Sequence, residues 1–312
     1  MPVCAEDVRD AYRFILGREP ESDDVVVHHQ FQAADIESLR LAFFRSDEFR
    51  SQAFLGGMPL MAPPQAIETE ADSTALRAII AKTAAAWEAL GETAPHFSVL
   101  SQERFKPEWF AENERLFFES GKSDLALLFA LLRRIGRPPE SLGCCLEYGC
   151  GVGRVTAHLA AAFSEVIAVD VSTPHLRLTQ ERMARLGQNN VSFVQVTPDN
   201  LHPATGYDLW FSRLVLQHNP PPVTLAILDR TFAGLAPRGV AVVHVPTYCN
   251  GYSFNVAHYL ADKLPAEHMH MHATPQKPIL ELAWRHGCCL LDVREEELSG
   301  WIMNILVFQK AA

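Results

Sequence analysis

The chain has 312 residues, of which 48% are hydrophobic and 21% are charged, proportions that are typical of a soluble globular protein. A net charge of −10 excludes nucleic acid as the expected partner, because a phosphate backbone requires a surface rich in Lys and Arg. No uninterrupted apolar run approaches the ~20 residues of a membrane span, so we expect no membrane partner either.

The cysteines indicate a reducing compartment. Seven occur, and four of them form the adjacent pairs Cys144-Cys145 and Cys288-Cys289 in apolar runs, where free cysteine behaves as a small hydrophobic residue. An odd count without a CxxC repeat disfavours a disulfide framework. The first residues, MPVCAEDVRD, lack the basic and apolar regions of a secretory signal, so we expect a cytoplasmic protein.

The N-terminal region predicts a small helical module over residues 1–52. Its first apolar stripe has helical spacing and consists of Val8, Ala11, Tyr12, Ile15 and Leu16. Gly17 follows this stripe as the expected helix C-cap. The segment QAFLGGMPLMAPPQ clusters Gly and Pro, so residues 53–72 are expected to form a linker.

The rest of the chain predicts an α/β protein. Helical patterns dominate residues 73–140, which we expect to form a lid or substrate-side segment. Over residues 141–312, short β-branched runs such as EVIAVDV and VAVVHV alternate with helical runs such as HLRLTQERMARLG. This alternation is typical of a mainly parallel, doubly wound sheet with helices on both faces.

A glycine-rich turn follows the first predicted strand of that sheet. In LEYGCGVGR, the residues Gly149, Gly151 and Gly153 alternate between the strand and a helix. Glycines permit positive φ and let a ligand lie against the backbone, and the helix N-terminus offers free N–H groups to an anion. Asp170 ends the next strand, 21 positions after Gly149, where a carboxylate can accept hydrogen bonds from both ribose hydroxyls.

The spacing of the glycines distinguishes between two types of adenosine cofactor, a dinucleotide and S-adenosylmethionine. A dinucleotide fingerprint is G-x-G-x-x-G, whereas this turn is G-x-G-x-G with the acidic Glu147 just before it. A carboxylate directed into the loop would repel a pyrophosphate and favour an ammonium or a sulfonium. S-adenosylmethionine carries both cations, so it is the predicted cofactor.

Four segments resemble, in order, the motifs of class I S-adenosylmethionine-dependent methyltransferases: LEYGCGVGR, VIAVDVS, YDLWFSRLVLQHNPPP and LAPRGVAVVHV. The resemblance begins near residue 96 and continues to the end. It implies a Rossmann-like, mainly parallel seven-stranded sheet that ends in an antiparallel C-terminal hairpin. The segments YRFILGREP and FFRSDEFR resemble a short helical module that recurs in bacterial proteins beside glycan-modifying enzymes, which implies docking or self-association; a helical extension that packs on the main domain is the alternative.

The resemblance implies a role for several residues of the cofactor site. Glu147 and the three loop glycines would hold the methionine part, and Asp170 and Val171 would hold the ribose. Asp199 and Asn200, in QVTPDNL, would flank the adenine, although this segment departs from the more usual Asp-Ala pair. Ser212 and Arg213, at the end of the fourth strand, would lie beneath the transferred methyl group.

His218, in LQHNPPP, is the candidate catalytic base, because an imidazole beside the methyl group could take a proton from a hydroxyl or an amine. Alternatively, it caps the loop around Pro220 to Pro222. The candidate acceptor-binding residues are His96, Tyr248, Asn250 and His272. Trp109 and Phe110 are interpreted as core contacts.

No metal is expected. His268, His270 and His272 alternate in AEHMHMHATPQ and could face a metal together, but no carboxylate or cysteine ligand accompanies them at a clear spacing. The predicted activity is methyl transfer to an O, N or S nucleophile of a small-molecule or glycan-type acceptor. The alternatives are a nucleotide-cofactor oxidoreductase and a non-catalytic assembly protein that binds the cofactor.

Overall fold

The computed structural model describes residues 3–51, 65–201, 204–263, 269–298 and 300–312. The chain divides into two compact units, Met1–Pro64 and Gln65–Ala312.

The first unit is helical. Its described helices are α1 (Ala5–Leu16), α2 (Asp23–Gln32), α3 (Ile36–Arg45) and α4 (Asp47–Ser51). They enclose a core of Val8, Tyr12, Leu16, Val26, Leu39, Phe43 and Phe49. Gly17 ends α1 with φ of 66° and donates its N–H to the carbonyl of Tyr12, so the predicted C-cap is confirmed.

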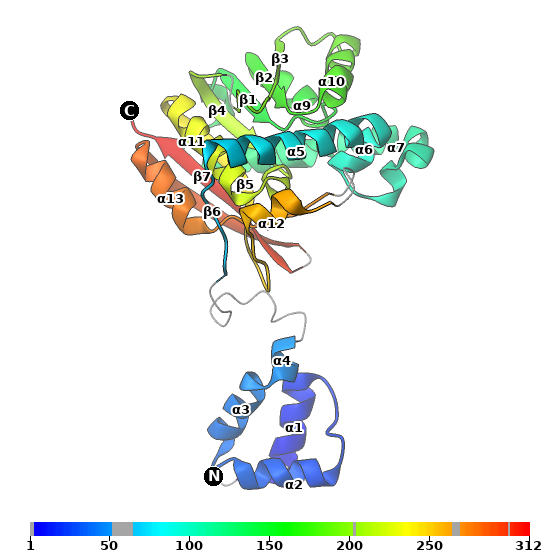
Figure 1. Cartoon of the computed structure of the whole chain (residues 1–312), viewed down its shortest axis with the longest axis vertical. Coiled ribbons are helices and arrows are strands. Elements are labelled where there is room, and N and C mark those ends of the chain that lie inside the picture. Colours follow the sequence, from blue (N-terminus) through cyan, green and yellow to red (C-terminus); the bar gives the residue numbers. More distant parts are fainter. Residues whose placement is uncertain (1–2, 52–64, 202–203, 264–268, 299) are drawn as a thin grey trace. The chain divides into compact units, whose positions relative to one another are not determined.

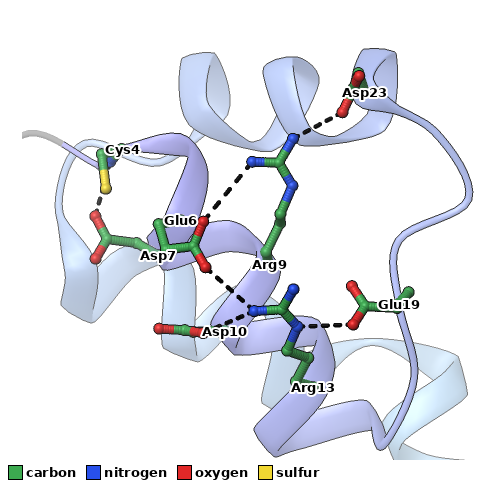
Figure 2. A network of polar contacts seen from close by, with 8 residues as sticks. All are labelled: Cys4, Glu6, Asp7, Arg9, Asp10, Arg13, Glu19 and Asp23. Atoms are coloured by element: carbon green, nitrogen blue, oxygen red, sulfur yellow. Dashed lines mark hydrogen bonds and ion pairs between the residues drawn. The ribbon is translucent and has the colours of Figure 1, made fainter.

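Ion pairs connect the outer face of α1 to its surroundings (Figure 2). Arg9 pairs with Asp23 of α2 at 2.7 Å, and Arg13 pairs with Glu19 at 2.7 Å and with Glu6 at 3.1 Å. These side chains are largely exposed, so water and salt screen the attraction. These ion pairs therefore contribute little to the stability of the first unit, which depends mainly on its apolar core.

The second unit begins with a segment that was expected to belong to the linker. Residues 53–64 of that predicted linker lie outside the described residues, but the part from Gln65 onward is packed. Ile67 forms a parallel bridge with Phe254, and Glu68 accepts hydrogen bonds from the side chain of Asn255 and from the N–H of Val256. Specific backbone and side-chain bonds therefore hold the last part of the predicted linker, around Ile67 and Glu68, against the second unit.

The second unit contains a seven-stranded sheet in the order β3-β2-β1-β4-β5-β7-β6. Its strands are β1 (Cys144–Tyr148), β2 (Glu165–Asp170), β3 (Val191–Gln195), β4 (Tyr207–Ser212), β5 (Leu235–Cys249), β6 (Cys288–Leu298) and β7 (Trp301–Lys310). The first five are parallel, and β7 runs antiparallel to both β5 and β6. The predicted Rossmann-like sheet with its antiparallel C-terminal hairpin is confirmed.

Helices surround the sheet (Figure 1). They are α5 (Ser73–Thr93), α6 (Pro95–Val99), α7 (Pro107–Glu119), α8 (Gly121–Arg134), α9 (Thr156–Ala160), α10 (Thr173–Arg185), α11 (Pro221–Gly234), α12 (Val256–Ala261) and α13 (Gln276–Arg285). Alternate strand residues face opposite layers, as the two-residue period of a strand requires. Leu146 and Trp210 pack with residues of α11 and α13, whereas Cys145 and Leu209 pack with residues of α8 and α9.

Candidate functional site

The turn between β1 and α9 requires its glycines. Gly149, Gly151 and Gly153 have φ of 79°, 55° and 78°, in the left-handed region that favours glycine. A Cβ on Gly149 would lie 2.4 Å from a methyl carbon of Val215, and one on Gly151 would lie 2.7 Å from a methyl carbon of Val99. Gly153 instead packs against α10. The first two glycines therefore border a cavity, and the third permits close helix packing.

We expect Gly149→Ala to destabilise the protein more than Gly136→Ala. Gly136 has a similar φ of 72°, but a Cβ there would meet no atom within 4 Å. The left-handed backbone alone should cost roughly 1–2 kcal/mol in both variants, and only Gly149→Ala adds a collision. Denaturant unfolding measures both losses, and equal losses would contradict a tightly packed turn.

The cavity lies where the carboxyl ends of β1, β2 and β4 meet. Its empty volume is about 1020 Å³, open solvent at the mouth included. The strand order reverses between β1 and β4, and ligands of doubly wound sheets bind at such a switch point. The dimensions suit a ligand of nucleoside size.

Asp170 ends β2 and lines this cavity, with only 8% of its surface exposed. The N–H of Gly151 donates to its Oδ2 at 2.8 Å, and the N–H of Ser172 donates to its Oδ1 at 2.9 Å. Each carboxylate oxygen can still accept another hydrogen bond. The carboxylate is therefore fixed in orientation and able to accept from ligand hydroxyls.

Glu147, on β1, is a second buried carboxyl group in the cavity wall. The hydroxyl of Thr156 donates to its Oε2 at 2.6 Å. Burial raises the pKa of Glu147 to about 8, and the nearby Arg154 opposes this rise only partly. Glu147 is therefore mostly protonated at neutral pH, and a cation that binds beside it would favour its ionised form.

This pKa predicts a specific pH dependence of stability. The pKa of Glu147 is higher in the folded protein, about 8, than its ordinary value of 4.5, so the folded state retains a proton that the unfolded chain releases. Stability from this site is complete below pH 4.5 and is lost as the pH rises to about 8. We expect Glu147→Gln, which mimics the protonated form, to gain stability relative to the wild type across this interval. Denaturant unfolding at several pH values tests it; a constant difference between the two proteins would contradict it.

Two arginines line the cavity and share one acidic partner. Arg154 lies 2.5 Å from Asp124, and Nε of Arg213 donates to the same carboxylate at 2.6 Å. Arg213 also donates to Glu296 at 3.2 Å. Among the described residues, both arginines line the cavity and neither acid does. The wall of the cavity therefore contains the two arginine side chains, and their acidic partners lie outside the cavity lining.

The residue after Arg213 has a strained backbone. Leu214 has φ of 61°, which is unusual for a residue with a side chain, and such strain clusters at functional sites. Its N–H donates to Nδ1 of His244 at 3.1 Å, and burial lowers the pKa of His244 to about 3, so this imidazole stays neutral and accepts. His244 thus holds the end of β4 in place.

Part of the lining is apolar, and we call it the apolar end. It consists of Val171, which follows β2, Val196 and Leu201, which follow β3, and Ile80 and Ile227 from α5 and α11. Such a wall suits a flat aromatic group, which gains from burial and needs few polar contacts.

The roof of the cavity comes from α5 and α6, through Thr83, Trp87, Ser98 and Val99. Ser98 bonds to Nε2 of His175 at 3.0 Å. Gly91 of α5 lies so close to α10 that a Cβ would be 2.5 Å from the hydroxyl oxygen of Ser172. The two helices of the roof therefore pack directly against the beginning of α10.

The predicted base contacts this roof. His218 is outside the cavity lining, and its ring meets that of Trp87 edge to face at 5.0 Å. Its Nδ1 lies 2.9 Å from the carbonyl oxygen of His270, which can only accept, so Nδ1 carries the proton and Nε2 the lone pair. Burial lowers the pKa of His218 to about 4, so the ring is neutral near pH 7.

Besides Gly153, three predicted cofactor residues lie outside the lining. The carboxylate of Asp199 is exposed and pairs with Arg77 at 2.8 Å, and Asn200 closes a tight turn with Thr197. Ser212 borders a smaller cavity, together with its neighbours Phe211 and Arg213 and residues of α8. Val171 and Leu201, rather than the polar pair, face the apolar end.

The four predicted acceptor-binding residues lie away from the cavity. His96 stacks on Phe110 with ring centroids 3.4 Å apart, and burial lowers its pKa to about 4. Tyr248 and Asn250 lie at the end of β5 and in the turn after it. Nδ1 of buried His272 lies 2.9 Å from the hydroxyl of Tyr252. Phe110 is half-buried, as a core contact requires, but Trp109 is 54% exposed.

His268 lies outside the described residues. Within the described ranges, no group of three or more His, Cys, Asp or Glu side chains could hold a metal ion. No helix in those ranges has the length and apolar character needed to cross a bilayer.

Sequence reasoning missed much of the lining. Thr83 and Trp87 come from a helix that precedes the glycine turn by more than fifty residues, and no motif marks them. Val215 and Asn219 could have been found, because both belong to the conspicuous segment LVLQHNPPP.

Comparisons with known proteins agree with this geometry. Residues 146–241 match a family model described as a methyltransferase domain. A trans-aconitate 2-methyltransferase of Methylobacterium radiotolerans is 36% identical over 118 residues, which are 37% of this chain and 42% of that protein. A tRNA/tmRNA (uracil-C(5))-methyltransferase of Psychromonas ingrahamii is 32% identical over 75 residues, or 24% of this chain and 20% of that protein. The chain thus spans less than half the length of these curated relatives.

Solved structures with similarity include magnesium protoporphyrin IX methyltransferase from Synechocystis, at 18% identity and a TM-score of 0.47, covering 69% of this chain and 100% of that one. A putative sarcosine dimethylglycine methyltransferase from Galdieria sulphuraria has 15% identity and a TM-score of 0.47. The similarity covers 64% of this chain and 88% of that one. The residues 146–241 that match the methyltransferase family model contain the glycine turn, Asp170 and the end of β4.

Proposed function

We propose that the protein is an S-adenosylmethionine-dependent methyltransferase that acts on a small-molecule acceptor. The observation that carries this proposal is that the glycine turn, Asp170, Glu147 and Arg154 all face one cavity of nucleoside size. The ribose hydroxyls, the ammonium and the carboxylate of the cofactor each have a matching partner there, namely Asp170, Glu147 and Arg154.

The proposed pose follows the edge of the sheet. The adenine occupies the apolar end beside Val171 and Leu201, and the ribose hydroxyls donate to Asp170. The amino-acid end lies over β1, where its ammonium approaches Glu147 and its carboxylate approaches Arg154. The ammonium favours ionised Glu147, so binding near pH 7 releases a proton from that group.

The chemistry is an in-line displacement. A lone pair on the acceptor's O, N or S atom forms a bond to the methyl carbon as the carbon–sulfur bond breaks. The electron pair of the broken bond goes to sulfur, which yields S-adenosylhomocysteine. Alignment of acceptor, methyl group and sulfur supplies most of the acceleration.

A hydroxyl or amine acceptor must also lose a proton, and we assign this role to His218. Its Nδ1 is fixed by the carbonyl of His270, which leaves the lone pair on Nε2. The ring lies next to Trp87, a residue of the cavity roof. Beside it, the N–H of His272 donates to the carbonyl of Gln217 at 2.7 Å, and the ring of His272 bonds to the hydroxyl of Tyr252.

The curated relatives are named for different acceptors, an organic acid and a uracil in RNA. The residues that match these relatives form the proposed cofactor site. The names of the relatives therefore do not identify the acceptor of this chain, which must be inferred from the residues that line the cavity. A glycan-type acceptor rests only on the resemblance of the N-terminal module.

We propose docking or self-association as the role of that module, because Phe14 and Phe31 are 85% and 87% exposed on its helices.

Isothermal titration with S-adenosylhomocysteine and with NAD tests the proposed cofactor. We expect micromolar binding of S-adenosylhomocysteine and no heat from NAD. Binding of NAD alone would favour the oxidoreductase alternative. Binding of S-adenosylhomocysteine without methyl transfer to any of a broad set of acceptors would favour the non-catalytic alternative.

A further inference from the structure

Part of the cavity lining is left free when the proposed cofactor is placed. It comes from the roof, from the segment after β4 and from the first turn of α11, and it consists of Trp87, Val99, Leu214, Val215, Asn219 and Val223. Val215 lies against the glycine turn, because a Cβ on Gly149 would be 2.4 Å from its methyl carbon. These six residues, which we call the acceptor wall, therefore adjoin the proposed place of the methionine part.

The acceptor wall carries no charge, since four of its members are aliphatic and the other two are a tryptophan and an asparagine. Arg213 precedes it in the chain but is not available to an anion. Its Nε donates to Asp124 and its Nη2 to Glu296. Among the described residues, its Nη1 is buried without a partner, so a ligand in the cavity cannot reach it.

This environment disfavours a charged acceptor of either sign. A carboxylate against the acceptor wall would be buried without a counter-ion, which is costly, and Asp170 in the same cavity would repel it. A protonated amine has no lone pair with which to attack the methyl carbon. The acceptor that matches the wall is therefore uncharged.

Asn219 adds one directed hydrogen-bond acceptor to the wall. Its Nδ2 donates to the carbonyl of Val215 at 3.1 Å. A carbonyl oxygen can only accept, so the amide nitrogen must face it and Oδ1 must point away. Oδ1 accepts no hydrogen bond from the described residues, and it is not among their buried atoms without a partner. It is therefore accessible to a donor on a ligand.

Trp87 adds a flat surface and one donor. Its ring lies 5.0 Å from that of His218 and 6.2 Å from that of His175, which restricts the plane of the indole. Among the described residues its Nε1 has no partner, and unlike Nε1 of Trp210 it is not buried. An aromatic ring gains from contact with a second ring beyond the burial of its area.

We infer that the methyl acceptor is an uncharged aromatic compound that packs on Trp87 and donates an N–H or O–H to Oδ1 of Asn219. This inference rests on the proposed function, because it takes the rest of the cavity to be filled by the cofactor. Trp87 and Asn219 are then specificity-determining residues: the first selects a ring, and the second selects a ring with a donor at its edge.

The test uses the full-length protein saturated with S-adenosylhomocysteine. Phenol, aniline, anisole and benzoate are titrated into it near pH 7 and followed by nuclear magnetic resonance. We expect phenol and aniline, which are uncharged at this pH, to bind roughly tenfold or more tightly than benzoate, whose charge would be buried unpaired. Phenol should also bind roughly threefold or more tightly than anisole, which has the same ring but no donor.

Matched variants assign these preferences to residues. Asn219→Leu keeps the volume without the acceptor oxygen, so it should bind phenol and anisole equally. Asn113→Leu is its control, because Nδ2 of Asn113 also donates to a carbonyl four residues earlier, at 2.9 Å, but outside the cavity lining. Trp87→Leu should weaken all the uncharged rings by roughly fivefold or more. Trp284→Leu removes a tryptophan that is 79% exposed and should have no effect.

The inference is overturned if benzoate binds as tightly as phenol and aniline, or if none of the aromatic probes binds. These comparisons use only the wild type, so they do not depend on the folding of any variant. A folded Asn219→Leu protein that still prefers phenol to anisole would also overturn it. Failure of S-adenosylhomocysteine to bind the wild type would instead overturn the proposed function, and this inference with it.

Discussion

Asp170→Ala should weaken the binding of S-adenosylhomocysteine by about 100-fold or more. Hydrogen bonds to a charged group each contribute roughly 1.5–3 kcal/mol, and the ribose would donate two of them to this carboxylate. The substitution also leaves the N–H groups of Gly151 and Ser172 without their present acceptor. Isothermal titration measures the loss directly.

Two control variants separate a ligand contact from a general loss of structure. Asp170→Asn keeps the shape and one acceptor oxygen, so it should retain the fold and bind with an intermediate affinity. Asp199→Ala removes an exposed carboxylate that pairs with Arg77 outside the cavity, and it should bind normally. A folded Asp170→Ala protein with wild-type affinity would remove the basis for the proposed cofactor site.

His218→Ala should lower kcat by roughly 10²–10⁴-fold for a hydroxyl or amine acceptor and leave the affinity for S-adenosylhomocysteine nearly unchanged. The reason is the fixed tautomer, since the carbonyl of His270 holds the proton on Nδ1 and leaves Nε2 to accept. Single-turnover methylation, followed by mass spectrometry of the product, isolates the chemical step from product release.

The pH profile gives this prediction a second readout. Burial lowers the pKa of His218 to about 4, so the neutral ring predominates above that value and the rate should be lost only as the pH falls through about 4. His218→Gln retains a polar side chain of similar length but cannot take up a proton. A rate within a few-fold of the wild type in both variants would exclude proton transfer by His218 and leave alignment as the source of catalysis.

The sheet and the ribose end of the site could be predicted because they depend on local patterns. Alternation of apolar strands and amphipathic helices fixes a parallel sheet, and the glycines and Asp170 mark its ligand edge through backbone geometry. Gly149, Gly151, Asp170, Val171 and Glu147 were all predicted, and all line the cavity.

The acceptor end could not be predicted, because it depends on distant contacts. Thr83 and Trp87 reach the cavity only because α5 packs across the sheet, and nothing in their own segment marks them as ligand contacts. Ser212 was assigned to the site from its position at the end of β4, but the residues on either side of it, Phe211 and Arg213, line the cavity instead. In the first unit, α2 went unpredicted because its sequence, DDVVVHHQFQ, has three adjacent β-branched residues and no apolar stripe.

The place of β7 in the sheet has a consequence for biosynthesis. It fills the gap between β5 and β6, with paired residues from Val240 to Cys249 on one side and from Cys288 to Leu298 on the other. A ribosome makes β7 after both of its neighbours, so the emerging polypeptide presents two open strand edges until residue 310 has left the exit tunnel. Such edges favour pairing with other chains, so we expect the risk of aggregation to be greatest in this late interval of synthesis, before β7 is in place.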